Sequence, residues 1–268
     1  MVSYVTPQTY DSSKIVLGDI MVKNDPVPFQ RIPIKYQYAN SLGPLVIRTH
    51  QMFSFGLYEN TDQSKTGKVV GYSMPFVLYD AKEGKQQADE EFLSMIESIT
   101  NTIREKVSDP KVLSELKQKR KKKVDVEALT LMKSSIEKPN APPVMFVKLK
   151  TQFGSYPPEI ITPFYKKATK NEKGRTGRLV RVKNPLEYHK KKCTIIGGIA
   201  IESVFIGGMI ESIITKLNEV VVVKKLDYQP SIMTDLQFEY EFESESEEEE
   251  DEEPQKTKES KRGCLGPV

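Results

Sequence analysis

The chain is poor in the side chains that metal centres and disulfide frameworks require. Its 268 residues include 2 histidines and 2 cysteines. Neither His50 nor His189 has a cysteine or a second histidine at the spacing of metal ligands. Cys193 and Cys264 lie far apart, and a disulfide framework needs more cysteines than these. The sequence therefore predicts no metal site and no cofactor, and it favours a reducing compartment.

Long apolar runs and the common catalytic motifs are also missing. No run approaches the roughly 18 apolar residues of a membrane span, and residues 1–11 lack the basic start and apolar stretch of a signal peptide. The segment 65–68 lacks the flanking residues of a phosphate-binding loop, and no Gly-x-Ser-x-Gly elbow occurs. We expect a protein that is not an enzyme, does not span a membrane and is not secreted.

Charge is divided unevenly along the chain. Of the 37 acidic and 40 basic residues, 13 acids and 4 bases lie in the tail at 235–268, so residues 1–234 are strongly basic. A basic body suggests a polyanionic partner, and an acidic tail suggests a built-in competitor for that partner. The length allows one large domain or two small ones, of which we favour one body followed by a disordered tail.

Hydrophobic patterning predicts an α+β chain that is mostly β. Residues 1–40 are rich in proline, tyrosine and polar groups, which favours an extended N-terminal arm with at most one short strand, at 14–22. Residues 41–234 form the β-rich body, which starts with a long hairpin of two runs at 45–58 and 69–79. Within the second run, Pro75 argues for an edge strand.

A helical insertion is predicted at 89–123. Apolar residues recur at three- and four-residue spacing between Phe92 and Val107, as in an amphipathic helix. Asp109 and Pro110 then offer a cap and a first-turn proline for a second helix.

Five strands are predicted after the helices. Two glycine pairs punctuate the later ones, and they mark bulges, sharp bends or close backbone approaches, all frequent in small curled barrels. The strands are expected at 144–150, 160–165, 179–182, 194–205 and 212–223, with the glycine pairs at 197–198 and 207–208.

The strand at 144–150 places unusual side chains together. Its alternation puts Phe146, Lys148 and Lys150 on one face. A ring and two ammonium groups on one face are typical of a sheet that binds nucleic acid. The alternative is an ordinary amphipathic strand with solvated lysines.

The segment 166–192 is the densest cluster of positive charge. It contains 11 basic residues and 2 acidic ones. Tyr165 and Tyr188 flank its glycine-containing centre at 171–178. Such bases attract phosphate, and each ring that stacks on a base contributes about 1 to 3 kcal/mol. The alternative is a solvated basic loop. The candidate phosphate contacts here are Lys167, Lys173, Arg175, Arg178 and Arg181.

Two further charged segments are ambiguous. The basic run at 117–123 suits a helix-dipole complement, a nuclear-import signal or a phosphate contact. In 238–243 rings alternate with carboxylates, so an extended chain would imitate single-stranded nucleic acid and compete for a basic groove. Equally, these residues continue the strand pattern as an edge strand, which leaves a solubilising tail.

The order of these features resembles the single-stranded-DNA-binding proteins of large nucleocytoplasmic DNA viruses. The resemblance covers about half of the chain, and it implies an OB-like barrel that binds DNA. The resembling parts are the helix at 91–107, the segments 139–150 and 160–164, and the segment 198–208 followed by 212–223.

From the residues and the resemblance together, we expect an OB-like barrel with a helical insertion that binds single-stranded DNA without sequence preference in viral replication, recombination or repair. RNA is a second candidate ligand, the acidic tail would recruit replication proteins, and homo-oligomers are left open. The alternative is a virion structural or genome-packaging protein that uses the same basic surface. The expected locations are the viral factory in the host cytoplasm, the host nucleus or the virion.

Overall fold

The computed structural model describes most of the basic body of the chain. The described residues are 3–23, 28–62, 67–81, 84–117, 124–135, 138, 140–152, 154, 156–168, 178–207 and 210–226. The acidic tail, Lys173, Arg175 and the basic run after Lys117 lie outside them. None of the helices within this part of the chain is long and apolar enough to cross a membrane.

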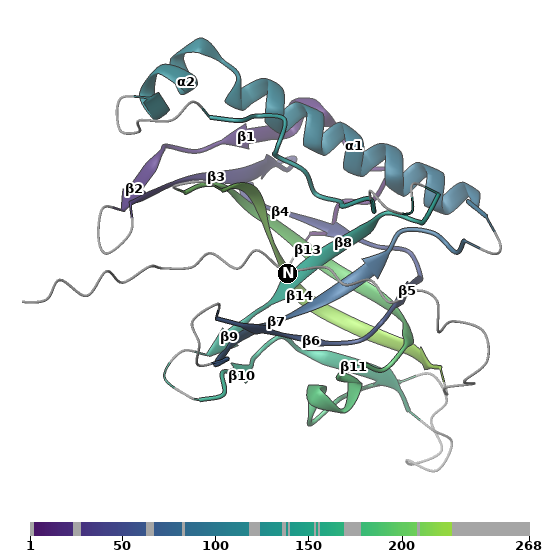
Figure 1. The fold of residues 1–268 in the computed structure, drawn as a ribbon. Helices are drawn as coiled ribbons and strands as arrows, with labels where there is room; N and C mark the ends of the chain where they lie inside the picture. The colour runs from purple at the N-terminus through teal and green to yellow at the C-terminus, as the bar shows by residue number, and fades with distance from the viewer. Residues whose placement is uncertain are drawn as a thin grey trace, which may run out of the picture.

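The described residues are mostly β, as the sequence predicts, and two α-helices interrupt the strands (Figure 1). The helices confirm the predicted insertion, and Lys111 N donates to Asp109 Oδ1 at 2.8 Å at the start of the second helix. In chain order the elements are η1 (Ser12–Lys14), β1 (Ile15–Leu17), β2 (Met21–Lys23), β3 (Phe29–Gln37), β4 (Leu42–Arg48), β5 (Met52–Ser54), β6 (Tyr58–Thr61), β7 (Val69–Val77), α1 (Gln87–Val107), α2 (Pro110–Lys117), β8 (Val144–Leu149), β9 (Thr151–Gln152), β10 (Glu159–Ile160), β11 (Phe164–Lys167), β12 (Leu179–Arg181), η2 (Pro185–Tyr188), β13 (Cys193–Ile206) and β14 (Glu211–Lys225).

The first forty residues supply strands of the sheet instead of the expected extended arm. β1 and β2 each pair with β3, and β3 also pairs with β4 and β13. In β3, Ile32, Ile34 and Tyr36 are buried and alternate with more exposed residues. This alternation lies around Pro33 in a segment rich in polar groups, which is why composition alone suggested an arm.

Pro75 lies in an interior strand, so the prediction of an edge strand is wrong. β7 pairs with β8 on one side and with β5 and β6 on the other. On that second side, β6 pairs as far as Ser73 and β5 pairs at Val77, and no described strand residue pairs with Pro75 between them. A proline, which has no N–H to donate, fits at such a gap.

Within the described residues, a 12-stranded sheet is organised around β13. One edge of β13 pairs in turn with β5, β4 and β3, and the other edge pairs with β14. Because β5 pairs with β7, β7 with β8 and β8 with β14, the pairings return to β13 in a cycle. The sheet is strongly twisted (Figure 1), and we call the face that carries the buried rings of Phe76 and Phe164 its inner side and the opposite face its outer side.

The helix α1 packs its apolar stripe into the same core as the inner side of the sheet. Phe92, Ile96 and Ile99 are fully buried in this core, and α1 lies across the sheet beside β1 (Figure 1). At its start, Asp89 Oδ2 accepts from Gln86 N at 2.8 Å, and Asp89 Oδ1 accepts from His50 Nε2 at 2.6 Å. The bond from Gln86 N pairs a backbone donor at the N-terminus of α1, and the bond from His50 ties this terminus to the segment after β4.

The glycine pair in β13 confirms the expectation of close approaches. A Cβ added to Gly197 would lie 2.7 Å from the ring of Phe76, which fills the inner side and is fully buried. A Cβ added to Gly198 would lie 2.7 Å from the ring of Tyr4, on the opposite side of the strand. The two glycines therefore admit one ring on each side of the sheet.

Gly197→Ala is expected to lower the free energy of unfolding by about 1 to 3 kcal/mol, because a buried ring cannot move aside without repacking the core. Urea unfolding followed by circular dichroism measures this change. The matched control is Gly71→Ala in β7, where the nearest atom would be Asn60 Nδ2 at 3.8 Å. Equal stability of the two variants would contradict the close packing inferred at Gly197.

Candidate nucleic-acid interface

The outer side of β8 and β14 displays lysines next to each other. Lys148 is exposed between buried Val147 and Leu149, and it pairs in parallel register with Lys216. Lys216 Nζ forms an ion pair with Glu202 Oε2 at 3.2 Å, and Lys150 Nζ donates to Asn218 Oδ1. Lys148 is thus the exposed cation of this group, since its neighbours already have partners.

β11 and β12 add a ring and two more cations to the outer side. Tyr165 is half-buried, and it pairs with Arg181 on one side and with Val221 on the other. Lys167 pairs with Leu179, and both are exposed. Phe164, which precedes Tyr165, is fully buried on the inner side.

β14 joins these two groups into one surface. β8 pairs with β14 at Lys216, and β11 pairs with the same strand at Val221. Five residues of strand separate these positions by about 17 Å. We call this surface the outer basic face; its members are Phe146, Lys148, Lys150, Tyr165, Lys167, Arg181 and Lys216.

The N-terminal segment lies at the border of the outer basic face. Tyr4 rests on Gly198, and its hydroxyl donates to Glu219 Oε1 at 2.5 Å. Burial and the Glu219 carboxylate raise the pKa of Tyr4 above its ordinary value. Arg48 is exposed and pairs with Gly198, so it adds another cation at this border.

Tyr188 does not lie on this face. Its ring is 4% exposed and stacks on Phe164, with centroids 6.2 Å apart and planes 15° apart. Burial is the main cause that raises the pKa of its hydroxyl, followed by Glu187. Because the ring is covered, Tyr188 cannot act as the stacking platform that the sequence suggested.

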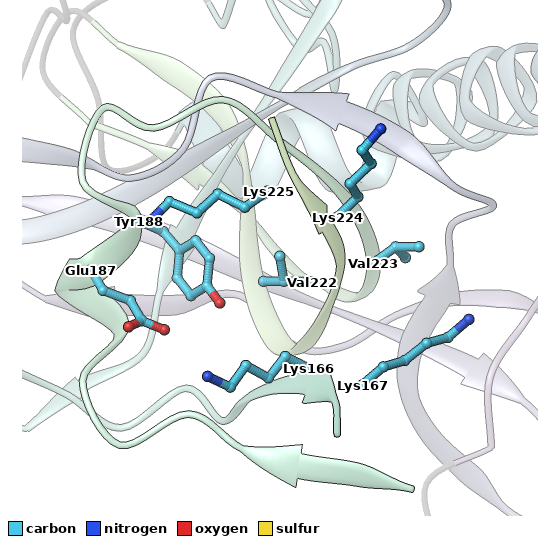
Figure 2. Close-up of a pocket in the computed structure, with 8 residues that line it drawn as sticks. All are labelled: Lys166, Lys167, Glu187, Tyr188, Val222, Val223, Lys224 and Lys225. Carbon is cyan, nitrogen blue, oxygen red and sulfur yellow. The ribbon is translucent and has the colours of Figure 1, made fainter. Parts of the chain in front are cut away.

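Tyr188 instead forms a wall of a pocket of about 250 Å³ between β11, η2 and the end of β14. Four lysines, Glu187 and two valines complete its lining. Figure 2 shows Lys166 and Lys225 extending on the side of Tyr188, whereas Lys167 and Lys224 extend away from it. Successive residues of a strand point to opposite faces, so Lys166 does not share the face of Tyr165 and Lys167.

Six of the ten predicted binding residues therefore share the outer basic face: Phe146, Lys148, Lys150, Tyr165, Lys167 and Arg181. Arg178 is exposed at the end of the β11–β12 hairpin, where its carbonyl accepts from Ala168 N at 2.9 Å. Lys173 and Arg175 lie outside the described residues. In the described part of the chain, His, Cys, Asp and Glu form no group of three that could hold a metal ion.

The sequence interpretation missed Arg48, Lys216 and Tyr4. Each of the first two lies between buried neighbours, Lys216 in an alternating part of β14 and Arg48 after three consecutive buried residues of β4, where no alternation is visible. Tyr4 gave no such signal, because its position depends on a long-range bridge between Val5 and Ile47.

Comparison with known proteins gives a family for the chain. The model of the family described as "Protein of unknown function (DUF2738)" matches residues 11–257, so the chain belongs to this family. The chain is also 24% identical over 222 residues to the "Early 31 kDa protein" of Frog virus 3 (isolate Goorha), which covers 81% of this chain and 79% of the relative. These matches support the expected link to large DNA viruses, whereas DNA binding stays a prediction.

Tyr4→Phe is expected to lower the free energy of unfolding by about 1 kcal/mol at neutral pH, because Glu219 loses a hydrogen-bond donor. The raised pKa of Tyr4 means that this contribution is complete below the ordinary value of 10.0 and is lost as the pH rises above it. Urea unfolding of both proteins at several pH values measures the difference. Tyr156→Phe is the control, since Tyr156 is 70% exposed; equal losses in both variants would contradict the role of the Tyr4–Glu219 bond.

Proposed function

We propose that this chain, as a member of the DUF2738 family, binds single-stranded DNA without sequence preference during viral replication, recombination or repair. The observation that supports this most is the meeting of Tyr165 and Arg181 as direct cross-strand neighbours on the outer basic face. A ring beside a guanidinium can hold a base and its phosphate at the same time.

The spacing of the cations suits a flexible strand. Lys148 and Tyr165 lie about 17 Å apart along β14, a distance that several nucleotides span. Neither position presents the paired donors and acceptors that read base edges in duplex DNA. Backbone contacts and stacking would therefore dominate the free energy of binding, and affinity would fall steeply as salt rises.

The pairing of strands supports an OB-like barrel as the scaffold. The cycle through β13, β5, β7, β8 and β14 has five strands, and five strands make the barrel of an OB-fold. In that fold oligonucleotides bind on an outer sheet face and the adjoining loops. The outer basic face and the hairpin that ends at Arg178 occupy comparable places in this proposal.

The name of the frog virus relative also favours this proposal over a virion structural role. That protein is named an early protein, and a replication function is needed before particles assemble. On this view the protein acts in the host cell, in the viral factory or the nucleus, and RNA is a competing ligand to be measured beside DNA.

Lys148→Ala with Arg181→Ala is expected to weaken binding to a fluorescent oligothymidylate and to flatten the salt dependence. Two lost phosphate contacts would reduce the slope of log K against log salt by about 1.4, at about 0.7 for each contact. Fluorescence anisotropy at a series of salt concentrations measures both quantities.

The control for this experiment removes two positive charges from the helices instead, with Lys106→Ala and Lys111→Ala. Both proteins carry the same net charge, so a general charge effect would change them equally. Equal affinity of the unmodified protein for duplex and single strands would favour the packaging alternative.

Removal of residues 235–268 is expected to tighten binding to single-stranded DNA, because 13 acidic residues are lost with only 4 basic ones. The same anisotropy titration measures the gain, which should shrink at high salt as the charges are screened. A truncated protein with unchanged DNA affinity would remove the competitor role from the tail. Loss of a replication partner on truncation would assign the tail to recruitment.

A further inference from the structure

The lysine-lined pocket adjoins the outer basic face, and Lys167 belongs to both. Lys166 pairs with Val222, which is buried on the inner side, whereas its neighbours Tyr165 and Lys167 belong to the outer side. Figure 2 shows Lys166 and Lys225 extending toward the side of Tyr188 and Glu187. The pocket therefore begins where a strand on the outer basic face would reach the end of β11.

The lining of the pocket combines three kinds of chemistry. Four lysines give it a strong preference for anions, and no described carboxylate forms an ion pair with any of them. Tyr188 and Val222 provide an apolar wall, and both are almost fully buried. Glu187 is exposed at the rim and can accept a hydrogen bond from a hydroxyl or amino group.

The volume limits what can enter. About 250 Å³ equals the space of roughly eight water molecules at about 30 Å³ each. A single nucleotide unit has that order of size, and it offers an anionic phosphate, hydroxyl or amino donors and a flat ring. A carboxylate of a peptide offers one negative charge, whereas a terminal phosphate offers up to two, which matches the two lysines on the side of Tyr188, Lys166 and Lys225.

We propose that this pocket binds the phosphorylated terminal nucleotide of a single strand that lies on the outer basic face. The inference depends on the proposed function and adds to it a preference for strand ends. In this arrangement the terminal phosphate lies between Lys166 and Lys225, and Glu187 accepts a hydrogen bond from a hydroxyl or amino group of the nucleotide. A strand without ends leaves the pocket unused.

The test compares oligothymidylates of about eight nucleotides, within the usual site size of an OB-fold. Three versions are used, with a 5′-phosphate, with a 3′-phosphate and with neither. The intact protein is expected to bind at least one phosphorylated version about tenfold more tightly, an effect typical of added charge-assisted hydrogen bonds. Lys166→Ala with Lys225→Ala should abolish this preference.

Circular single-stranded DNA separates this inference from the proposed function. The double variant should bind circular DNA as tightly as the unmodified protein does, and the Lys106→Ala, Lys111→Ala control should keep the preference for phosphorylated ends. Equal binding of all three oligonucleotides by the unmodified protein would overturn the end-binding site while leaving single-strand binding intact. The same conclusion would follow if the double variant lost as much affinity for circular DNA as for the phosphorylated oligonucleotides. Failure of the unmodified protein to bind circular DNA would overturn both proposals.

Discussion

Close packing on both sides of β13 is the constraint on which the rest of the structure depends. This strand pairs with β5, β4 and β3 along one edge and with β14 along the other, so it connects every part of the sheet. At its centre, Gly197 admits the ring of Phe76 on the inner side and Gly198 admits Tyr4 on the outer side. Larger side chains at these positions would push the rings of Phe76 and Tyr4 away from β13. The pairing of β13 with β14, and with it the outer basic face on β14, would then be disturbed.

The parts of the fold that depend on local pattern were predictable from the sequence. The spacing of Phe92, Ile96 and Ile99 gave α1, and Asp109 with Pro110 gave the start of α2. Errors occurred where a long-range pairing decides the outcome. Pro75 is tolerated in an interior strand because β5 and β6 end on either side of it and no described strand residue pairs with it on that side. Residues 1–40 join the sheet because β3 pairs with β13, which is distant in sequence.

In the candidate site, too, the sequence predicted what depends on local pattern and missed what depends on long-range packing. Alternation within one strand correctly grouped Phe146 and Lys148, since the period of two is a local property. The charge density of 166–192 could not reveal which bases share a face, because Lys166 and Lys167 point to opposite sides of β11. The sequence suggested that the Tyr188 ring is accessible to a ligand, whereas in the structure η2 places this ring against Phe164. Only the topology shows that Tyr165 lies on the outer basic face and that Lys166 and Tyr188 lie on the side of the pocket.

Partners within the protein decide which cations of the outer basic face form no ion pair with a carboxylate. Lys216 is neutralised by Glu202, and Lys150 is held by Asn218. The carboxylate of Glu219 is likewise engaged by Tyr4, so it is fixed at the border of the outer basic face. In the described part of the chain, Lys148, Lys167, Arg181 and Arg48 form no ion pair with a carboxylate.

These four cations come from four different strands, β8, β11, β12 and β4. Cations spread in this way would suit a flexible anionic backbone better than a compact anion, because each could contact a different phosphate and none would need to be desolvated deeply. The pocket has the opposite design, with several lysines around one small volume. The molecule thus presents distributed charge along a face and concentrated charge at one end, which is the charge arrangement that the two proposals require, one for the interior and one for the terminus of a single strand.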